Sequence, residues 1–131
     1  WSSDVCSSDL AVEALTGQQD TVAEMAKAFE ARRDMVVDML NEAPGIHCLK
    51  PDGAFYVFPS LRGCFGKTSA GGAKIVDDEA FVVALLEETG VAAVHGSAFC
   101  FPGYMRISYA TDTETLRDAC TRIQNFCKGL T

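Results

Sequence analysis

Residues 105–111 (Met-Arg-Ile-Ser-Tyr-Ala-Thr) alternate between apolar and polar side chains, and this pattern constrains the fold more than any other. A period of two is typical of a half-buried strand. It places Met105 and Ile107 on one face of the strand, and Arg106 with Ser108 on the other. The apolar face needs a covering layer, so we expect a sheet packed against further elements.

A long helix is predicted before this strand, over residues 18–43. Its apolar side chains recur at helical spacing. Asp20 or Thr21 can cap its start, and the Pro-Gly pair at 44–45 ends it. The predicted inward stripe consists of Val22, Met25, Phe29, Val36 and Leu40.

The remaining segments are, in order, a strand over 53–59, a loop over 60–76, a helix over 78–89, a strand over 90–94, and a last helix opened by a capping box of Thr111 and Glu114. The inward residues of the two helices are predicted to be Phe81, Val82, Leu85 and Leu86, and then Leu116, Ala119, Cys120, Ile123 and Cys127. Strands and helices are mixed without a long βαβ series. This order favours an α+β fold, in which a small antiparallel or mixed sheet of about three strands packs against helices.

The charge balance restricts the partners that this chain can have. With 18 acidic against 11 basic residues, the formal net charge is −7 at pH 7. Nucleic acids and anionic membrane surfaces require clustered basic residues, so we expect neither as a partner. No apolar run approaches the roughly 20 residues of a membrane span. The six cysteines show no zinc-binding spacing and indicate reduced thiols in a cytoplasmic protein.

The first ten residues differ from the rest of the chain. The tetrapeptide Ser-Ser-Asp-Val at 2–5 returns as Ser-Ser-Asp-Leu at 7–10. This segment has neither the cationic start nor the long apolar stretch of a secretory signal. We therefore expect residues 1–10 to be a non-native leader and residues 11–131 to form one domain, which the length allows.

Three motifs invite a catalytic interpretation that their spacing does not support. Residues 63–68 end in Gly-Lys-Thr, but a phosphate-binding loop needs its first glycine where this chain has Leu61. Ser97 lacks the glycine two residues on that a nucleophile elbow requires, so we interpret it as part of a tight glycine turn. A lone histidine after an apolar strand, such as His95, is more often structural than an acid or base.

Arg106 is the candidate binding residue. Its guanidinium is a rigid fork of donors suited to a planar carboxylate or phosphate. Gly96 and Gly103 leave room beside the strand. The fork can bind an anion if it faces a cleft, whereas an arginine that faces water carries no such meaning.

Three blocks of sequence resemble one known family. They are residues 53–59 (Gly-Ala-Phe-Tyr-Val-Phe-Pro), 90–99 (Gly-Val-Ala-Ala-Val-His-Gly-Ser-Ala-Phe) and 106–111 (Arg-Ile-Ser-Tyr-Ala-Thr). In order and spacing they are similar to the C-terminal small domain of class I pyridoxal-phosphate aminotransferases, most closely the bacterial aspartate aminotransferase group. The resemblance covers residues 11–131. The family's turn after the second block usually continues with glycine, where this chain has Cys100.

The resemblance implies that Arg106 binds the α-carboxylate of the substrate. It implies an enzyme that uses pyridoxal 5'-phosphate to transfer an amino group between an amino acid, aspartate by default, and a 2-oxo acid such as 2-oxoglutarate. The parent would be a cytoplasmic homodimer whose large domain binds most of the cofactor. No residue here matches the cofactor-bearing lysine, and Lys67 and Lys74 lie between the family's blocks. With no catalytic residue of its own, the fragment is expected to be inactive alone.

Two other classes of function stay open from the sequence. One is a non-catalytic α+β module that binds an amino acid or carboxylate through Arg106. The other is a purely structural interaction domain. Titration with dicarboxylates separates these two. The side-chain specificity of the parent enzyme is also open, including an aromatic or prephenate-type preference.

Overall fold

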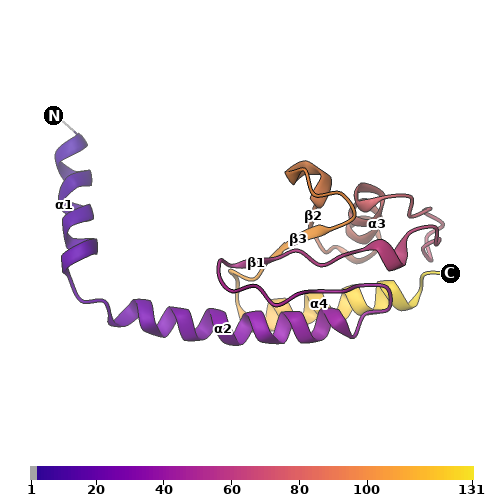
Figure 1. Cartoon of the computed structure of the whole chain (residues 1–131), viewed down its shortest axis with the longest axis horizontal. Coiled ribbons are helices and arrows are strands. Elements are labelled where there is room, and N and C mark those ends of the chain that lie inside the picture. Colours follow the sequence, from indigo (N-terminus) through magenta and orange to yellow (C-terminus); the bar gives the residue numbers. More distant parts are fainter. Residues whose placement is uncertain (1–2) are drawn as a thin grey trace.

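The computed structural model describes residues 3–131, with side chains from residue 8 onward. This part of the chain contains four α-helices and a three-stranded antiparallel sheet (Figure 1). The helices are α1 (Ser3–Thr16), α2 (Asp20–Asn41), α3 (Asp78–Thr89) and α4 (Thr113–Lys128). The strands are β1 (Tyr56–Val57), β2 (Val94–His95) and β3 (Met105–Ser108), and two short 3-10 helices are η1 (Arg62–Cys64) and η2 (Gly96–Phe99). The predicted α+β fold is confirmed.

Strand β3 is the centre of the sheet, with β1 on one side and β2 on the other, both antiparallel to it. The paired residues are Tyr56 with Ser108, Val57 with Ile107, Val94 with Arg106, and His95 with Met105. Met105 and Val57 are buried on the core face, whereas Arg106 and Tyr56 lie on the outer face. The alternation predicted for β3 is therefore confirmed.

All three strands are shorter than the sequence predicts. Ala54 has a φ of +66°, which is incompatible with a strand and delays β1 until Tyr56. Gly90 has a left-handed conformation and ends α3, so it does not belong to the second strand. Pairing of that strand begins only at Val94. Strands β1 and β2 pair only with β3 in this sheet. The four residues of β3 therefore limit the length of both ladders.

Helices α2 and α4 lie side by side beneath the sheet (Figure 1), and the hydrophobic core fills the space between these layers. Val36 and Leu40 of α2 and Ile123 of α4 are fully buried there. The two helices are also tied by the Gln124 side chain, whose amide donates to the Met39 carbonyl oxygen at 2.7 Å.

The first half of α2 extends beyond this core, and α1 stands away from it (Figure 1). The inward stripe was therefore wrong at Val22 and Met25, which are 58% and 57% exposed. The predicted cap was also wrong: Gln19 is the residue before the helix, and its side chain makes no capping hydrogen bond. Asp20 lies in the first turn, where its negative charge is favoured by the positive end of the helix dipole. None of the helices within residues 3–131 has the length and apolar content to cross a membrane.

The predicted boundary between residues 10 and 11 falls inside α1, which runs without a break from Ser3 to Thr16. The side chains of residues 8–16 are exposed. The leader stays a prediction.

Helix α3 has the predicted bounds, and helix α4 begins later than predicted. Asp77 caps α3 by accepting a hydrogen bond from the Ala80 amide at 2.8 Å. Asp112, not Thr111, caps α4, where its carboxylate accepts from the Thr115 amide at 2.9 Å. A carboxylate is a stronger acceptor than a hydroxyl, and it carries a charge that the helix N-terminus favours.

The inward stripes of these two helices are confirmed with two exceptions. Leu86 is 50% exposed, because the stripe of α3 turns towards Ala84 and Leu85 instead. Ala119 is only partly buried at the edge of the α4 stripe.

The predicted loop over 60–76 contributes side chains to the core. Leu61, Cys64 and Ile75 are fully buried. The backbone of Thr68 pairs with that of Thr131 at the C-terminus, through N–H to O distances of 2.7 and 3.0 Å. The Gly-Lys-Thr run lies in this irregular segment, and the next α-helix along the chain, α3, starts only at Asp78.

Cys120 and Cys127 are buried, as predicted, and face two further buried thiols, Cys48 and Cys64. Burial, with the neighbouring Cys120, raises the pKa of Cys48 to about 12. Burial also raises the pKa of Cys120 to about 11. Thiols that stay protonated are poor nucleophiles, so Cys48 and Cys120 act as small apolar residues.

The uneven burial of α2 leads to a first prediction. Leu40→Ala removes a fully buried side chain and should lower the free energy of unfolding by about 2–5 kcal/mol. Val22→Ala, on the protruding half of the same helix, should change it by less than about 0.5 kcal/mol. Urea unfolding of the two variants measures both values. Equal losses would contradict the exposed position of the N-terminal half.

Candidate carboxylate-binding site

The guanidinium of Arg106 lies against two aromatic rings on the outer face of the sheet. Its Cζ is 4.3 Å from the centre of the Phe99 ring and 5.6 Å from that of Tyr56. Cation–π contact of this kind orients a guanidinium without using its hydrogen-bond donors. Among the side chains described from residue 8 onward and the backbone of residues 3–131, the structure gives the Arg106 guanidinium no hydrogen bond or ion pair. Its donors are therefore available to an anion.

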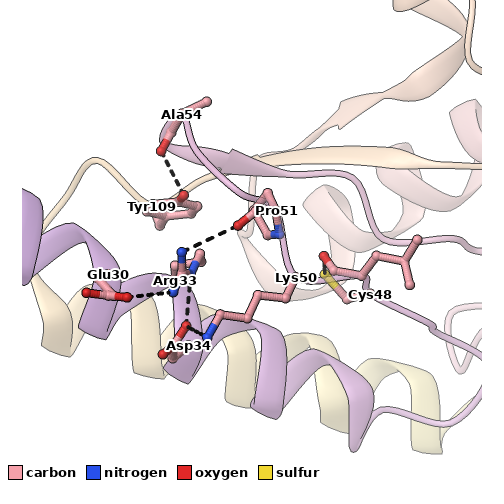
Figure 2. Close-up of polar contacts among 9 residues, drawn as sticks. Glu30, Arg33, Asp34, Cys48, Lys50, Pro51, Ala54 and Tyr109 are labelled. Carbon is pink, nitrogen blue, oxygen red and sulfur yellow. Dashed lines mark hydrogen bonds and ion pairs between the residues drawn. The ribbon is translucent and has the colours of Figure 1, made fainter.

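Arg33, another half-buried arginine, shows the opposite arrangement (Figure 2). Its Nε donates to Asp34 at 2.8 Å and its Nη2 to Glu30 at 3.2 Å, while Nη1 reaches the Pro51 carbonyl oxygen at 3.4 Å. The hydrogen bond to Asp34 raises the pKa of Arg33, and the Arg33 and Lys50 bonds lower the pKa of Asp34. Because its charge is neutralised within the chain, Arg33 is not a ligand site.

The Tyr56 side of the site is fixed through Tyr109, which follows β3. The Tyr109 amide donates to the Phe55 carbonyl oxygen at 2.8 Å, and its hydroxyl donates to the Ala54 carbonyl oxygen at 2.8 Å (Figure 2). Burial raises the pKa of this hydroxyl, which therefore keeps its proton and remains a donor. These bonds hold the positive φ of Ala54 and set where Tyr56 enters the sheet.

The Phe99 side is fixed by the turn between β2 and β3. The Gly96 amide donates to the Tyr104 carbonyl oxygen at 2.7 Å and closes this turn. A Cβ on Gly96 would lie 2.2 Å from the Phe101 carbonyl oxygen, so only glycine fits there. The turn predicted for this run is confirmed, and the Ser97 hydroxyl is engaged by Asp78 at 2.9 Å rather than free to act as a nucleophile.

Asp78 was predicted only as a helix residue, yet it is a buried carboxylate that joins the start of α3 to this turn. Burial opposes its charge, but hydrogen bonds from Ser97 and Gly103 outweigh that effect and hold the pKa of Asp78 below its usual value. His95 lies beside it, with Nδ1 3.9 Å from a carboxylate oxygen, too far for a hydrogen bond. Asp78 has no recognisable sequence signal, because its bonds reach residues 19 and 25 positions away.

An aromatic surface surrounds the arginine. Phe58 makes edge-on contacts with Phe99 and Phe101, with ring centres 5.9 and 6.0 Å apart. The neighbouring rings are also partly exposed, at 39% for Tyr56, 42% for Phe99 and 46% for Phe101. The sequence signal for this surface was the aromatic run at 55–58, which was interpreted only as a strand.

The two hollows in the described part of the chain do not fit pyridoxal phosphate. One hollow of about 440 Å³ lies between the Gly90–Ala92 segment, β3 and α4, and another of about 300 Å³ lies beside Arg33 and Tyr109. Neither is lined by a lysine or by Arg106. Lys67 and Lys74 lie in the 60–76 segment, as predicted, and are not brought to β3 by the fold.

Comparison with known proteins identifies the family. The model of the family described as aminotransferase class I and II matches residues 1–123. This chain belongs to the class I and II aminotransferases. The family prediction made from the three sequence blocks is thereby confirmed.

Related aminotransferases are much longer than this chain. The aspartate/prephenate aminotransferase of Cereibacter sphaeroides is 63% identical over 120 residues, which are 92% of this chain and 30% of that protein. The asparagine–oxo-acid transaminase of Streptococcus mutans is 47% identical over 116 residues, 88% of this chain and 28% of that protein. The chain thus spans about 30% of the length of such relatives.

Solved aminotransferase structures share the fold. The aspartate aminotransferase from Rhizobium meliloti superposes with a TM-score of 0.89 at 43% identity, covering 92% of this chain and 30% of that one. The alanine aminotransferase from Pyrococcus furiosus gives a TM-score of 0.79 at 35% identity, covering 90% of this chain and 28% of that one.

The backbone at Cys100 leads to a second prediction. Cys100 has a φ of +57°, a left-handed conformation that costs a non-glycine residue roughly 1–2 kcal/mol. Cys100→Gly should therefore make the chain about 1 kcal/mol more stable than Cys100→Ala, after allowing for the flexibility of glycine in the unfolded state. Urea unfolding of both variants tests this. An alanine variant as stable as the glycine variant would show that the turn is not strained.

Proposed function

We propose that this chain forms part of a pyridoxal-phosphate-dependent aminotransferase and that Arg106 binds the α-carboxylate of its amino-acid substrate. The observation that carries the proposal is the guanidinium held between Tyr56 and Phe99 without an acidic partner in the described part of the chain. A planar fork in this state matches a carboxylate through two parallel, charge-assisted hydrogen bonds. The contrast with the neutralised Arg33 supports the choice of arginine.

The substrates proposed are aspartate as amino donor and a 2-oxo acid, 2-oxoglutarate, as acceptor. Support comes from relatives named aspartate/prephenate aminotransferase and aspartate aminotransferase. Pyridoxal phosphate supplies the electron sink for such a transfer when it is bound. Since no lysine lines the two hollows of this chain, we propose that residues outside it hold the cofactor. The intact enzyme would be a cytoplasmic homodimer.

In this arrangement, the chain's own contribution is orientation. Two hydrogen bonds from Arg106 fix the plane of the substrate carboxylate, and the rings of Tyr56 and Phe99 limit how far the guanidinium can turn. Fixing a reactant in this way lowers the entropic part of a reaction barrier. The side chain performs no bond-breaking step itself.

The role of Arg106 is tested by titrating the 131-residue chain with succinate, a dicarboxylate, and measuring its affinity by isothermal titration calorimetry, with the Arg106 Nε–Hε NMR signal as a second readout in the chains that keep Arg106. Arg106→Ala should weaken succinate binding by about ten- to a hundredfold, as expected for a charge-assisted pair worth roughly 1.5–3 kcal/mol. Arg32→Ala is the matched control, because Arg32 also lies over an aromatic ring, 5.6 Å from the centre of Phe29. Equal affinity in the Arg106 variant would refute the role.

Because the cofactor is proposed to be held by residues outside this chain, we expect that the chain alone does not form a catalytic lysine adduct. After incubation with pyridoxal phosphate and reduction with borohydride, mass spectrometry should find no stoichiometric adduct at a single lysine, and the chain should show no transamination. The full-length Rhizobium meliloti aspartate aminotransferase is the positive control. A single modified lysine accompanied by turnover would overturn the proposal that the cofactor is held elsewhere.

A further inference from the structure

The position of the Phe99 ring depends on a buried carboxylate in another element. Asp78, at the first turn of α3, is 2% exposed. Its Oδ2 accepts from the Ser97 amide at 2.7 Å, and its Oδ1 accepts from the Ser97 hydroxyl at 2.9 Å and the Gly103 amide at 3.2 Å. A buried charge is retained only where donors replace its lost hydration, and here all three come from a single turn.

These three bonds hold both ends of the segment that leads from β2 into β3. Ser97 lies in η2, at the beginning of the segment, and Gly103 lies two residues before Met105, where β3 starts. The segment also has internal bonds, from the Cys100 amide to the Ser97 carbonyl oxygen and from the Phe101 amide to the Gly96 carbonyl oxygen. Those bonds give the turn its shape, whereas the Asp78 bonds fix the turn relative to α3.

Phe99 is the last residue of η2, two positions after Ser97. Its ring is the nearer of the two that contact the Arg106 guanidinium, at 4.3 Å against 5.6 Å for Tyr56. Because the Arg106 guanidinium has no hydrogen bond in the part of the chain that the structure describes, its contacts with the two rings orient it. A shift of η2 relative to α3 therefore moves the ring and releases the guanidinium.

We propose that Asp78 is a positioning residue for Arg106: its carboxylate holds the turn over 96–103, and through that turn the Phe99 ring that orients the guanidinium. The inference rests on the proposed role of Arg106 in binding a carboxylate. Asp78 itself touches neither Arg106 nor the face on which a substrate would lie. It acts across two elements, from the N-terminus of α3 to the outer face of the sheet.

The test uses three variants of the 131-residue chain. Asp78→Asn keeps the shape of the side chain but removes its charge and one acceptor oxygen. Ser97→Ala removes only the 2.9 Å hydroxyl bond and leaves the amide bonds in place. Glu79→Gln is the matched control, since it removes an exposed negative charge from the same first turn of α3.

Two readouts separate positioning from stability. The first is the ring-current displacement that Phe99 imposes on the Arg106 side-chain protons, measured by NMR without ligand. In Asp78→Asn this displacement should be lost, in Ser97→Ala reduced, and in Glu79→Gln unchanged. The second readout is succinate affinity, which should fall by about fivefold in Asp78→Asn, as expected for the loss of one cation–π contact.

The outcomes distinguish this inference from the proposed function. If the unsubstituted chain fails to bind succinate, the role of Arg106 fails, and the ring-current readout still decides whether Asp78 positions it. If Asp78→Asn does not fold, the milder Ser97→Ala decides. If a folded Ser97→Ala or Asp78→Asn chain keeps the ring-current displacement of the Arg106 protons at the value of the unsubstituted chain, the inference is overturned and Asp78 has a purely structural role.

Discussion

The pairing of β3 with a strand on each side is the constraint on which the rest of the structure depends. It places Met105 and Tyr109 in the core and Arg106 on the opposite face, because neighbouring residues of a strand point to opposite sides. The same pairing brings Tyr56 from β1 to the outer face beside Arg106. The segment after β2 then has to turn tightly to enter β3, and that turn carries Phe99.

The hydrogen-bond donors of Arg106 are available because the described part of the chain places no acidic side chain beside its guanidinium. The charge of Arg33 is matched by Glu30 and Asp34, which lie on its own helix one turn and one residue away. Arg106 is opposite Val94 in the sheet and lies against rings, so the chain offers it orientation without neutralisation. An arginine held in that way can give its hydrogen bonds to an external carboxylate. Membership of the class I and II aminotransferases is consistent with this proposed use.

The hydrophobic core, which contributes most of the stability, lies on the opposite side of the sheet from Arg106. Val36 and Leu40 of α2, Ile123 of α4 and Met105 of β3 are fully buried in one cluster, whereas α1 and the first half of α2 contribute little to it. The core therefore stabilises the platform beneath the sheet, and polar bonds from Asp78 and Tyr109 set the fine positions above it. Apolar burial has no preferred direction, so it cannot fix the orientation of a ring as a hydrogen bond does.

The sequence by itself determined the order of the elements from α2 onward, the two faces of β3, the bounds of α3 and the family, because each of these depends on local periodicity or on short motifs. Helix α1 was not predicted. The sequence did not predict four features: the strand lengths, the exposed half of α2, the Asp112 cap and the burial of residues in the 60–76 segment. Each of them depends on contacts with other residues in the folded chain. For the candidate site, the sequence proposed Arg106 as the binding residue but did not predict the side chains around it, and the binding role of Arg106 stays a prediction. Tyr56 and Phe99 lie 50 and 7 residues from it in the chain, and Asp78 acts on it through Ser97. Only the tertiary structure could decide these contacts, because they form between segments whose spacing in the sequence carries no period.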